Sequence, residues 1–309
     1  MFVVVGEAVV DLVGRPGERT FMAHPGGSPA NVALGLARLG APVTLSTRLG
    51  EDAFGQMLRS HLEASGVKLE AGSRPDAATS LAIALLDDGV ATYDFRIDWE
   101  IDTLPTLPAD TWCLHTGSLA TVLPPGDQVV MELVRGERSR GHVTVSYDPN
   151  VRPAVLRDAA RAQPRIERVV SDVDVVKVSD EDLRWLYPGE PDDDVARRWL
   201  AMGPLLVVVT RAGEGVHAVT RAHQVNRPAM AVDLVDTVGA GDAYMSGLLD
   251  GLRLGDLLGG GRRDALAAVD ESTLIGVLDR AAAVAAITCS RPGANPPTQR
   301  EVELALART

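Results

Sequence analysis

Short apolar runs alternate with segments of helical periodicity along most of the chain. From Thr111 onward this pattern predicts strands and helices in regular succession. We expect strands at 112–116, 142–147, 173–178 and 205–210, and helices at 126–139, 164–171, 180–186 and 192–201. Such alternation predicts an α/β fold in which a mainly parallel sheet is covered by helices on both faces.

The first third of the chain begins with the same kinds of element. Residues 2–13 are rich in Val and predict a strand that is buried on both faces. Ser28 is a good N-cap, Pro29 suits the first helical position and Gly40 is a typical helix end, so we expect a helix between them. A strand at 42–48 and a helix from Gly50 to about Ser65 should follow.

A hairpin interrupts the alternation. Residues 80–86 and 90–97 are strand-like runs on either side of Asp87-Asp88-Gly89, and Asp-Gly between two such runs is a strong hairpin signal. Together with the early polar–apolar segment, this predicts a small second sheet, a lid formed by about 12–24 and 80–98. We find no linker that would separate domains and expect one domain over 1–309.

Towards the C-terminus, strand runs at 216–219 and 223–232 precede a glycine-rich turn and helices at 243–254, 265–269, 273–289 and 298–307. The turn is Val235-Asp236-Thr237-Val238-Gly239-Ala240-Gly241-Asp242, and we interpret it as the junction of a strand and a helix. The first N–H groups of such a helix lack partners and favour an anion, and the glycines let the backbone approach it.

Asp242 is unexpected in a turn that favours anions. A carboxylate beside an anion site is what phosphoryl transfer to an alcohol requires. Asp is also a favoured N-cap residue, so the local spacing alone is equally consistent with a capping role.

Two earlier polar residues have the same ambiguity. Asp11 interrupts the Val-rich strand and is either a binder of a polyol ligand or a charge at the exposed end of the strand. Asn31 lies in the first turn of its helix, where it either assists the cap or points into the space above the Gly26-Gly27 pair.

Composition and charge exclude several classes of protein. The net charge of −12 argues against a nucleic-acid surface. Cys113 and Cys289 are isolated, which favours free thiols in a reducing compartment. The N-terminus has no basic segment typical of a signal peptide, and no apolar run looks long enough to span a membrane, so we expect a cytoplasmic protein.

The common nucleotide and metal motifs are missing. Neither Lys68 nor Lys177 is followed by Ser or Thr, so the chain has no P-loop. The turn at Gly239 begins like a dinucleotide fingerprint but ends in Tyr244 and carries an acid, which disfavours a nicotinamide oxidoreductase. The histidines form no His-Glu-x-x-His zinc motif.

Two stretches together resemble the signatures of the ribokinase (PfkB) carbohydrate kinase family. They are Pro25-Gly26-Gly27-Ser28-Pro29-Ala30-Asn31-Val32-Ala33 and Asp236-Thr237-Val238-Gly239-Ala240-Gly241-Asp242. The resemblance extends over essentially the whole chain, and the segments at 148–153 and 288–294 look most like the bacterial fructokinase branch. It implies a ribokinase-like three-layer α/β/α fold with a β-sheet lid, and an ATP-dependent sugar kinase that uses Mg²⁺, with K⁺ as a second candidate ion.

The resemblance also implies roles for individual residues. Asp242 would be the base, with Gly239, Ala240 and Gly241 forming the anion hole. The sugar would be bound by Asp11, Gly26, Gly27, Asn31 and Arg152. ATP and phosphate would be bound by Asp148, Asn150, Lys177, Ser179, Thr210, Gly213 and Gly215. Asp182 would contact Mg²⁺ indirectly, and Asp236 with the Val238 carbonyl would form a monovalent-cation site.

The sequence departs from the family at two positions. Ser179 replaces the Asn of an Asn-x-x-Glu motif, in which Asp182 keeps the carboxylate, and Ala212 stands where a glycine is usual. We expect fructose as the substrate, with 2-keto-3-deoxygluconate, ribose or a nucleoside as alternatives, since Arg152 could pair with a sugar-acid carboxylate. A catalytically silent sugar-binding protein is a further alternative. Lid-to-lid dimers occur in the family, so a homodimer through the lid is a further expectation.

Overall fold

A computed structural model describes residues 1–71, 77–87, 90–101 and 106–307. Its larger sheet has nine strands in the order β13-β12-β11-β10-β9-β8-β1-β4-β5. These strands are β1 (Phe2–Val5), β4 (Val43–Thr47), β5 (Lys68–Ala71), β8 (Cys113–Gly117), β9 (Thr144–Asp148), β10 (Val175–Ser179), β11 (Leu206–Thr210), β12 (Val216–Val219) and β13 (Gln224–Arg227). All neighbours pair in parallel except β11–β12 and β12–β13. The predicted mainly parallel sheet is therefore confirmed.

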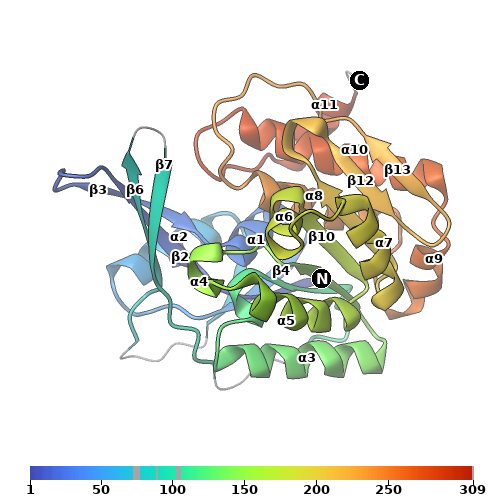
Figure 1. Cartoon of the computed structure of the whole chain (residues 1–309), viewed down its shortest axis with the longest axis horizontal. Coiled ribbons are helices and arrows are strands. Elements are labelled where there is room, and N and C mark those ends of the chain that lie inside the picture. Colours follow the sequence, from blue (N-terminus) through green and yellow to red (C-terminus); the bar gives the residue numbers. More distant parts are fainter. Residues whose placement is uncertain (72–76, 88–89, 102–105, 308–309) are drawn as a thin grey trace.

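Helices cover both faces of this sheet (Figure 1). One face packs against α1 (Ser28–Arg38), α2 (Ala53–Ala64), α8 (Ala240–Leu254), α9 (Arg263–Ala267) and α10 (Glu271–Cys289). The other face packs against α3 (Gly126–Arg140), α5 (Ala159–Ser171), α6 (Asp180–Leu186) and α7 (Asp192–Met202). Short elements complete the described chain: η1 (Ser118–Thr121), α4 (Pro153–Leu156), η2 (Ala212–Glu214), η3 (Gly260–Arg262) and α11 (Gln299–Leu306). The three-layer α/β/α architecture is thus as expected.

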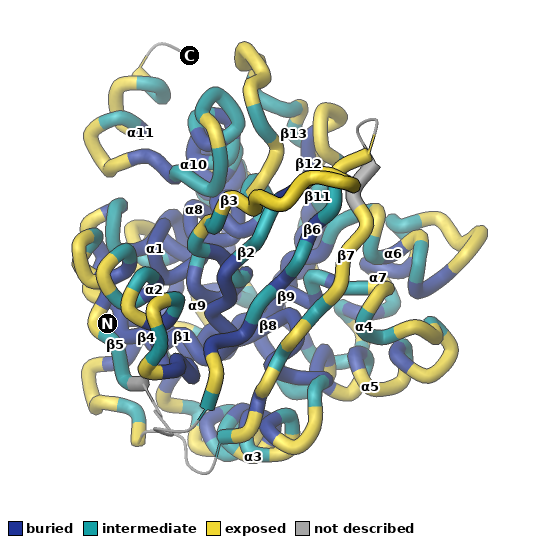
Figure 2. Tube along the Cα trace, turned by 90° about the vertical axis from the view of Figure 1, so that its left-hand side faces the viewer, coloured by how far each residue is buried: buried dark blue, intermediate teal, exposed yellow. Residues whose placement is uncertain are grey.

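A second sheet projects from this body (Figure 1). Its four strands have the order β3-β2-β6-β7. They are β2 (Val9–Gly14), β3 (Phe21–Gly26), β6 (Leu81–Asp87) and β7 (Val90–Arg96). Figure 2 shows the two central strands largely covered and the edge strands β3 and β7 mostly exposed. Strands β6 and β7 pair antiparallel, as the hairpin signal predicts, although the predicted turn at 88–89 lies outside the described residues.

Several predicted boundaries are wrong for local reasons. Residues 2–13 form two strands that belong to different sheets, because the chain turns at Gly6, where a Cβ would lie 2.2 Å from the Pro29 ring. The predicted strand at 223–232 ends at Arg227, since Pro228 cannot donate to the ladder. Helix α5 begins before the predicted start and contains Pro164 within it. Ser28 is not an N-cap: Gly27 holds that position, and Ser28 lies in α1.

The expectation that no segment is long enough to span a membrane is also wrong by length and composition. Among the described helices, α10 is long and apolar enough to cross a membrane, with a mean hydropathy of 1.4. Its Leu274, Leu278 and Ala281 are fully buried in the core that it shares with α8. This packing accounts for the apolar composition of the helix.

Candidate functional site

Three of the predicted site residues lie at the carboxyl ends of the parallel strands. Asp148 ends β9, Ser179 ends β10 and Thr210 ends β11, and Ser179 and Thr210 are directly paired. The N-terminus of α8 faces this edge, because Lys177 of β10 contacts Gly241. Ligands of open α/β sheets bind at this edge, so the fold and the sequence motifs point to one location.

The turn that precedes α8 keeps a backbone donor free. Gly239 is the N-cap, with a left-handed φ of 75°, and a Cβ at this position would lie 2.6 Å from the Ala294 side chain. The Ala240 N–H donates to the Thr237 carbonyl at 3.1 Å. No protein acceptor is recorded for the Gly241 N–H among residues 1–71, 77–87, 90–101 and 106–307. An anion at this helix end would meet that N–H and the positive end of the helix dipole.

Asp242 lies in the first turn of α8 and does not cap the helix, so the capping interpretation is wrong. The residue is 8% exposed, and its carboxylate accepts hydrogen bonds from Ser28 Oγ at 2.6 Å and Asn31 Nδ2 at 2.9 Å. Asn150 Nδ2 lies 3.5 Å from the same carboxylate. Burial raises the pKa of Asp242, and these donors together with the Lys177 charge oppose that rise. The carboxylate is therefore fixed in direction and kept in a low-dielectric setting.

A buried ion pair lies beneath the turn. Lys177 Nζ is 2.7 Å from Asp148 Oδ2 and donates to the Gly241 carbonyl at 3.3 Å. Burial acts to lower the pKa of Lys177, but the Asp148, Asp242 and Asp182 carboxylates together outweigh burial and the pKa is raised. The ammonium group thus stays charged inside the protein.

The residues predicted to bind the sugar, which is the phosphoryl acceptor, lie on β2 and around the start of α1. Asp11 is half-buried in the middle of β2, which excludes the exposed-end interpretation. A Cβ on Gly26 would lie 2.1 Å from Asp11 Oδ2, and Gly27 has a φ of 100° that favours glycine. Burial raises the pKa of Asp11 to about 6, the charge of Arg152 lowers it and that of Asp242 raises it. Asp11, Arg152 and Asp242 therefore belong to one electrostatic cluster.

Arg152 precedes α4 and donates from Nη1 to Asn150 Oδ1 at 2.6 Å. Asn150 has a left-handed φ of 37°, and its N–H donates to Asp148 Oδ1 at 3.2 Å. Because Asn150 also approaches Asp242, the segment 148–152 connects the predicted sugar-binding residues to the end of β9.

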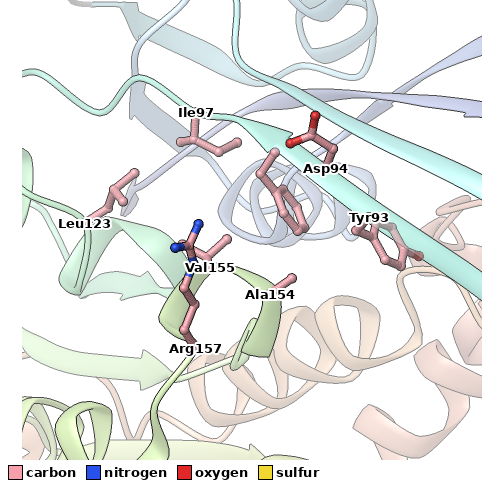
Figure 3. Close-up of a pocket in the computed structure, with 8 residues that line it drawn as sticks. Tyr93, Asp94, Ile97, Leu123, Ala154, Val155 and Arg157 are labelled. Atoms are coloured by element: carbon pink, nitrogen blue, oxygen red, sulfur yellow. The ribbon is translucent and has the colours of Figure 1, made fainter.

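A cavity of about 310 Å³ separates the small sheet from α4. Its lining includes Phe95. Figure 3 shows the other lining residues: Tyr93, Asp94 and Ile97 come from the small sheet and the segment after it, and Leu123, Ala154, Val155 and Arg157 from the body of the protein. Phe95 pairs with Ala82, which in turn pairs with Asp11. Paired residues share a face of a sheet, so the cavity continues the face that carries Asp11.

The predicted nucleotide loop follows β11. Thr210 Oγ1 donates to the Val178 carbonyl at 3.4 Å. Gly213 lies within η2, and Gly215 has a φ of 96°, where a Cβ would lie 2.0 Å from the Arg227 carbonyl oxygen. Ala212 has a φ of 44°, so it adopts a left-handed conformation at the position where the family has glycine. This residue bears local strain that glycine would avoid.

The residues predicted to bind metal ions provide few ligand atoms. Asp182 Oδ1 accepts the Val151 N–H at 3.0 Å, while Ser179 caps α6 by accepting the Asp182 N–H at 3.0 Å. Burial raises the pKa of Asp182 to about 6. The Asp236 carboxylate accepts N–H groups of Val238 at 3.0 Å and Gly293 at 2.8 Å. Within the described part of the chain, no three His, Cys, Asp or Glu side chains meet as a metal site. One carboxylate is compatible only with an ion held mainly by phosphates and water.

Sequence reasoning missed two polar residues at this site. Ser28 was interpreted as a cap, yet its hydroxyl binds the Asp242 carboxylate. Glu7 is 4% exposed in the connection between β1 and β2, and its backbone oxygen would lie 2.6 Å from a Cβ on Gly27. A glutamate directly after an apolar strand was the available signal for Glu7, and it was obscured when 2–13 was treated as one strand.

Comparisons with known proteins identify the family. Residues 1–301 match the pfkB family carbohydrate kinase model. A fructokinase of Rhizobium leguminosarum bv. trifolii is 34% identical over 284 residues, covering 89% of this chain and 85% of the relative.

Solved structures have the same fold. The fructokinase of Xylella fastidiosa with bound ATP has a TM-score of 0.88 at 28% identity, covering 99% of this chain and 98% of its own. A double mutant of the Vibrio cholerae O395 fructokinase with fructose, ADP and potassium ion bound has a TM-score of 0.83 at 26% identity, covering 98% and 97% of the two chains. The chain therefore belongs to the pfkB family of carbohydrate kinases.

Proposed function

We propose that this carbohydrate kinase transfers the γ-phosphoryl group of ATP to a hydroxyl of fructose. The observation that carries the proposal is the buried Asp242 carboxylate, oriented by Ser28 and Asn31 beside the free N-terminus of α8. A base next to an anion site is what the reaction needs. The fructokinases among its relatives support fructose as the acceptor.

In this mechanism the acceptor hydroxyl lies against Asp11 and the Gly26-Gly27 backbone, with Asp242 in line behind it. The hydroxyl oxygen forms a bond to the γ-phosphorus as the bond to the β,γ-bridging oxygen breaks, and ADP leaves. Asp242 accepts the hydroxyl proton. The Gly241 N–H and the dipole of α8 stabilise charge on the transferred group.

Metal ions complete the proposal. Mg²⁺ bound to the ATP phosphates would neutralise their charge, with Asp182 contacting it indirectly. We also propose a K⁺ site at Asp236 and the Val238 carbonyl, supported by the potassium ion in the Vibrio cholerae relative. Thr210, Gly213 and Gly215 would contact the nucleotide.

We further propose that the small sheet acts as a lid over the acceptor and that the chain 1–309 works as one domain. Exposed Phe21, Met22, Leu86 and Tyr93 lie on this sheet and support a homodimer through it, which light scattering in solution would test. The need for ATP and the two free cysteines support a cytoplasmic location.

Turnover with a panel of acceptors tests the function. We expect ADP release, followed by a coupled assay, with the highest kcat/KM for fructose among fructose, 2-keto-3-deoxygluconate, ribose, glucose and adenosine. Chelation of Mg²⁺ should abolish turnover, and Na⁺ in place of K⁺ should lower it. Absence of turnover with every acceptor would favour the silent sugar-binding alternative, and a higher value for another acceptor would overturn fructose.

The rate should depend on pH on the acid side. Asp11 and Asp182 have pKa values of about 6, and the pKa of Asp242 is also raised. The reaction needs the ionised carboxylates, so activity is present above these pKa values and is lost as pH falls through them. We expect kcat/KM for fructose to fall below about pH 6 in a profile from pH 5 to 8. A profile that stays flat down to pH 5 would contradict these assignments.

A further inference from the structure

Lys177 occupies a position in the sheet where an apolar residue is usual. Its neighbours Val176 and Val178 face the helices α3, α5, α6 and α7, and Lys177 points to the opposite face, towards α8. Its side chain is 4% exposed. An ammonium group is rarely buried to this extent without a specific role.

Two protein groups already bind this ammonium. Asp148 Oδ2 lies 2.7 Å and the Gly241 carbonyl oxygen 3.3 Å from Nζ. A Cβ on Gly241 would lie 3.1 Å from Nζ, so the turn and the ammonium are in close contact. The ammonium has three N–H donors, of which Asp148 and Gly241 occupy two, and the 4% exposure of the side chain leaves little surface on which an ATP phosphate could reach the third.

The ion pair therefore joins the elements that carry the reacting groups. Through Asp148, Lys177 is connected to the Asn150 backbone at the end of β9. Through Gly241, it holds the first turn of α8, which carries Asp242. Lys177 and Asp148 act directly on the pKa of Asp242, and Asp11 and Arg152 belong to the same cluster of charges.

We propose that Lys177 is a positioning residue: it fixes the first turn of α8 against the end of β9, so that the Gly241 N–H and the Asp242 carboxylate are aimed at the reacting groups, and it does not bind phosphate directly. This inference rests on the proposed phosphoryl transfer. It replaces the phosphate-binding role that the family resemblance implies for Lys177.

Kinetics of a Lys177→Met/Asp148→Asn variant, which removes both charges of the ion pair, tests the proposal. We expect kcat to fall about 10- to 100-fold, because the first turn of α8 loses the hydrogen bond from Lys177 that fixes it. The KM for ATP should stay within about threefold, since a purely positional loss leaves ground-state binding intact. The fall of kcat at low pH should move slightly to higher pH: the variant loses the Lys177 charge, which lowers the pKa of Asp242, and this loss outweighs that of the Asp148 charge, which raises it. A KM for ATP raised about tenfold or more, with the fall of kcat at an unchanged pH, would overturn the proposal.

Two further measurements keep the inference separate from the function itself. Affinity for the β,γ-imido analogue of ATP, measured by calorimetry, should be equal in wild type and variant even if the wild type proves to phosphorylate no sugar; a lost affinity would show direct phosphate binding. Arg138→Met is the matched control, because it removes a cation from another fully buried carboxylate, Asp174, at the opposite edge of the sheet. The Arg138→Met variant should be less stable than the wild type, but its kcat should fall at the same low pH. An equal shift of this fall in the control would overturn the positioning role.

Discussion

Replacement of Asp242 by Asn should lower kcat on the order of 10²-fold or more, because the variant loses the group that accepts the hydroxyl proton. The amide has the same shape and can still accept the hydrogen bond from Ser28. Its NH₂ group would face the Asn31 amide nitrogen, which now donates to Asp242 at 2.9 Å. We therefore expect a folded protein with a small loss of stability and a large loss of turnover.

The measurement is the coupled assay of ADP release with fructose, together with thermal unfolding of both proteins. Asp250→Asn is a suitable control, since Asp250 is a fully buried carboxylate further along the same helix, paired with Arg280. It should reduce stability and leave turnover of the folded protein near that of the wild type. If Asp242→Asn retained kcat within about threefold of the wild type, Asp242 would not be the base.

The turn before α8 shows what a local motif can predict. Its glycines predicted a helix N-terminus with unpaired backbone donors, because backbone donors and flexible residues are properties of the segment itself. The role of Asp242 as the base stays a prediction. Sequence spacing could not separate a base from a cap. The distinction depends on Ser28 and Asn31, which are brought to Asp242 from more than two hundred residues away by the packing of α1 against α8.

Errors in the predicted fold have a similar origin. The alternation of strands and helices predicted the parallel sheet and its covering helices, because burial on both faces leaves a clear apolar pattern. The same pattern hid the junction at Gly6, where β1 ends and the chain enters the small sheet. The run 2–13 is apolar on both sides of this junction, so hydrophobicity alone could not indicate that its two halves belong to different sheets.

Lys177 illustrates a limit of transfer by resemblance. The family pattern suggests a phosphate ligand, since a lysine near an anion site commonly serves as one. The ion pair with Asp148 depends on two adjacent strands whose residues are far apart in sequence. Only the assembled sheet shows that the charge of this lysine is already neutralised.

The stability of the protein should fall as pH rises from about 4.5 to 7, in part because of Glu7. Burial raises the pKa of this carboxyl to about 7 from its usual value of 4.5. The native state then holds a proton that the unfolded chain has released. The contribution of Glu7 to stability is present below pH 4.5 and is lost as pH rises through 7.

Glu7→Gln should remove this dependence, because Gln resembles the protonated acid and stays neutral. Its oxygen can accept the weak hydrogen bond that Leu119 N–H donates to Glu7 Oε1 at 3.4 Å. The other carboxylate oxygen, Oε2, has no recorded partner among the described residues. Relative to wild type, the free energy of unfolding of the variant should therefore rise by about 3 kcal/mol between pH 4.5 and pH 8.

Denaturant unfolding of both proteins across this pH range measures the difference. Glu137→Gln is the matched control: Glu137 is 5% exposed but has Arg140 as a cationic partner, so its replacement should not stabilise the protein at pH 8. A Glu7→Gln protein whose stability relative to wild type is the same at both ends of the range would show that the pKa of Glu7 in the native state equals its pKa in the unfolded chain. Since Glu7 lies in the connection between the two sheets, such a result would require a cation or donor to reach Oε2 at that junction.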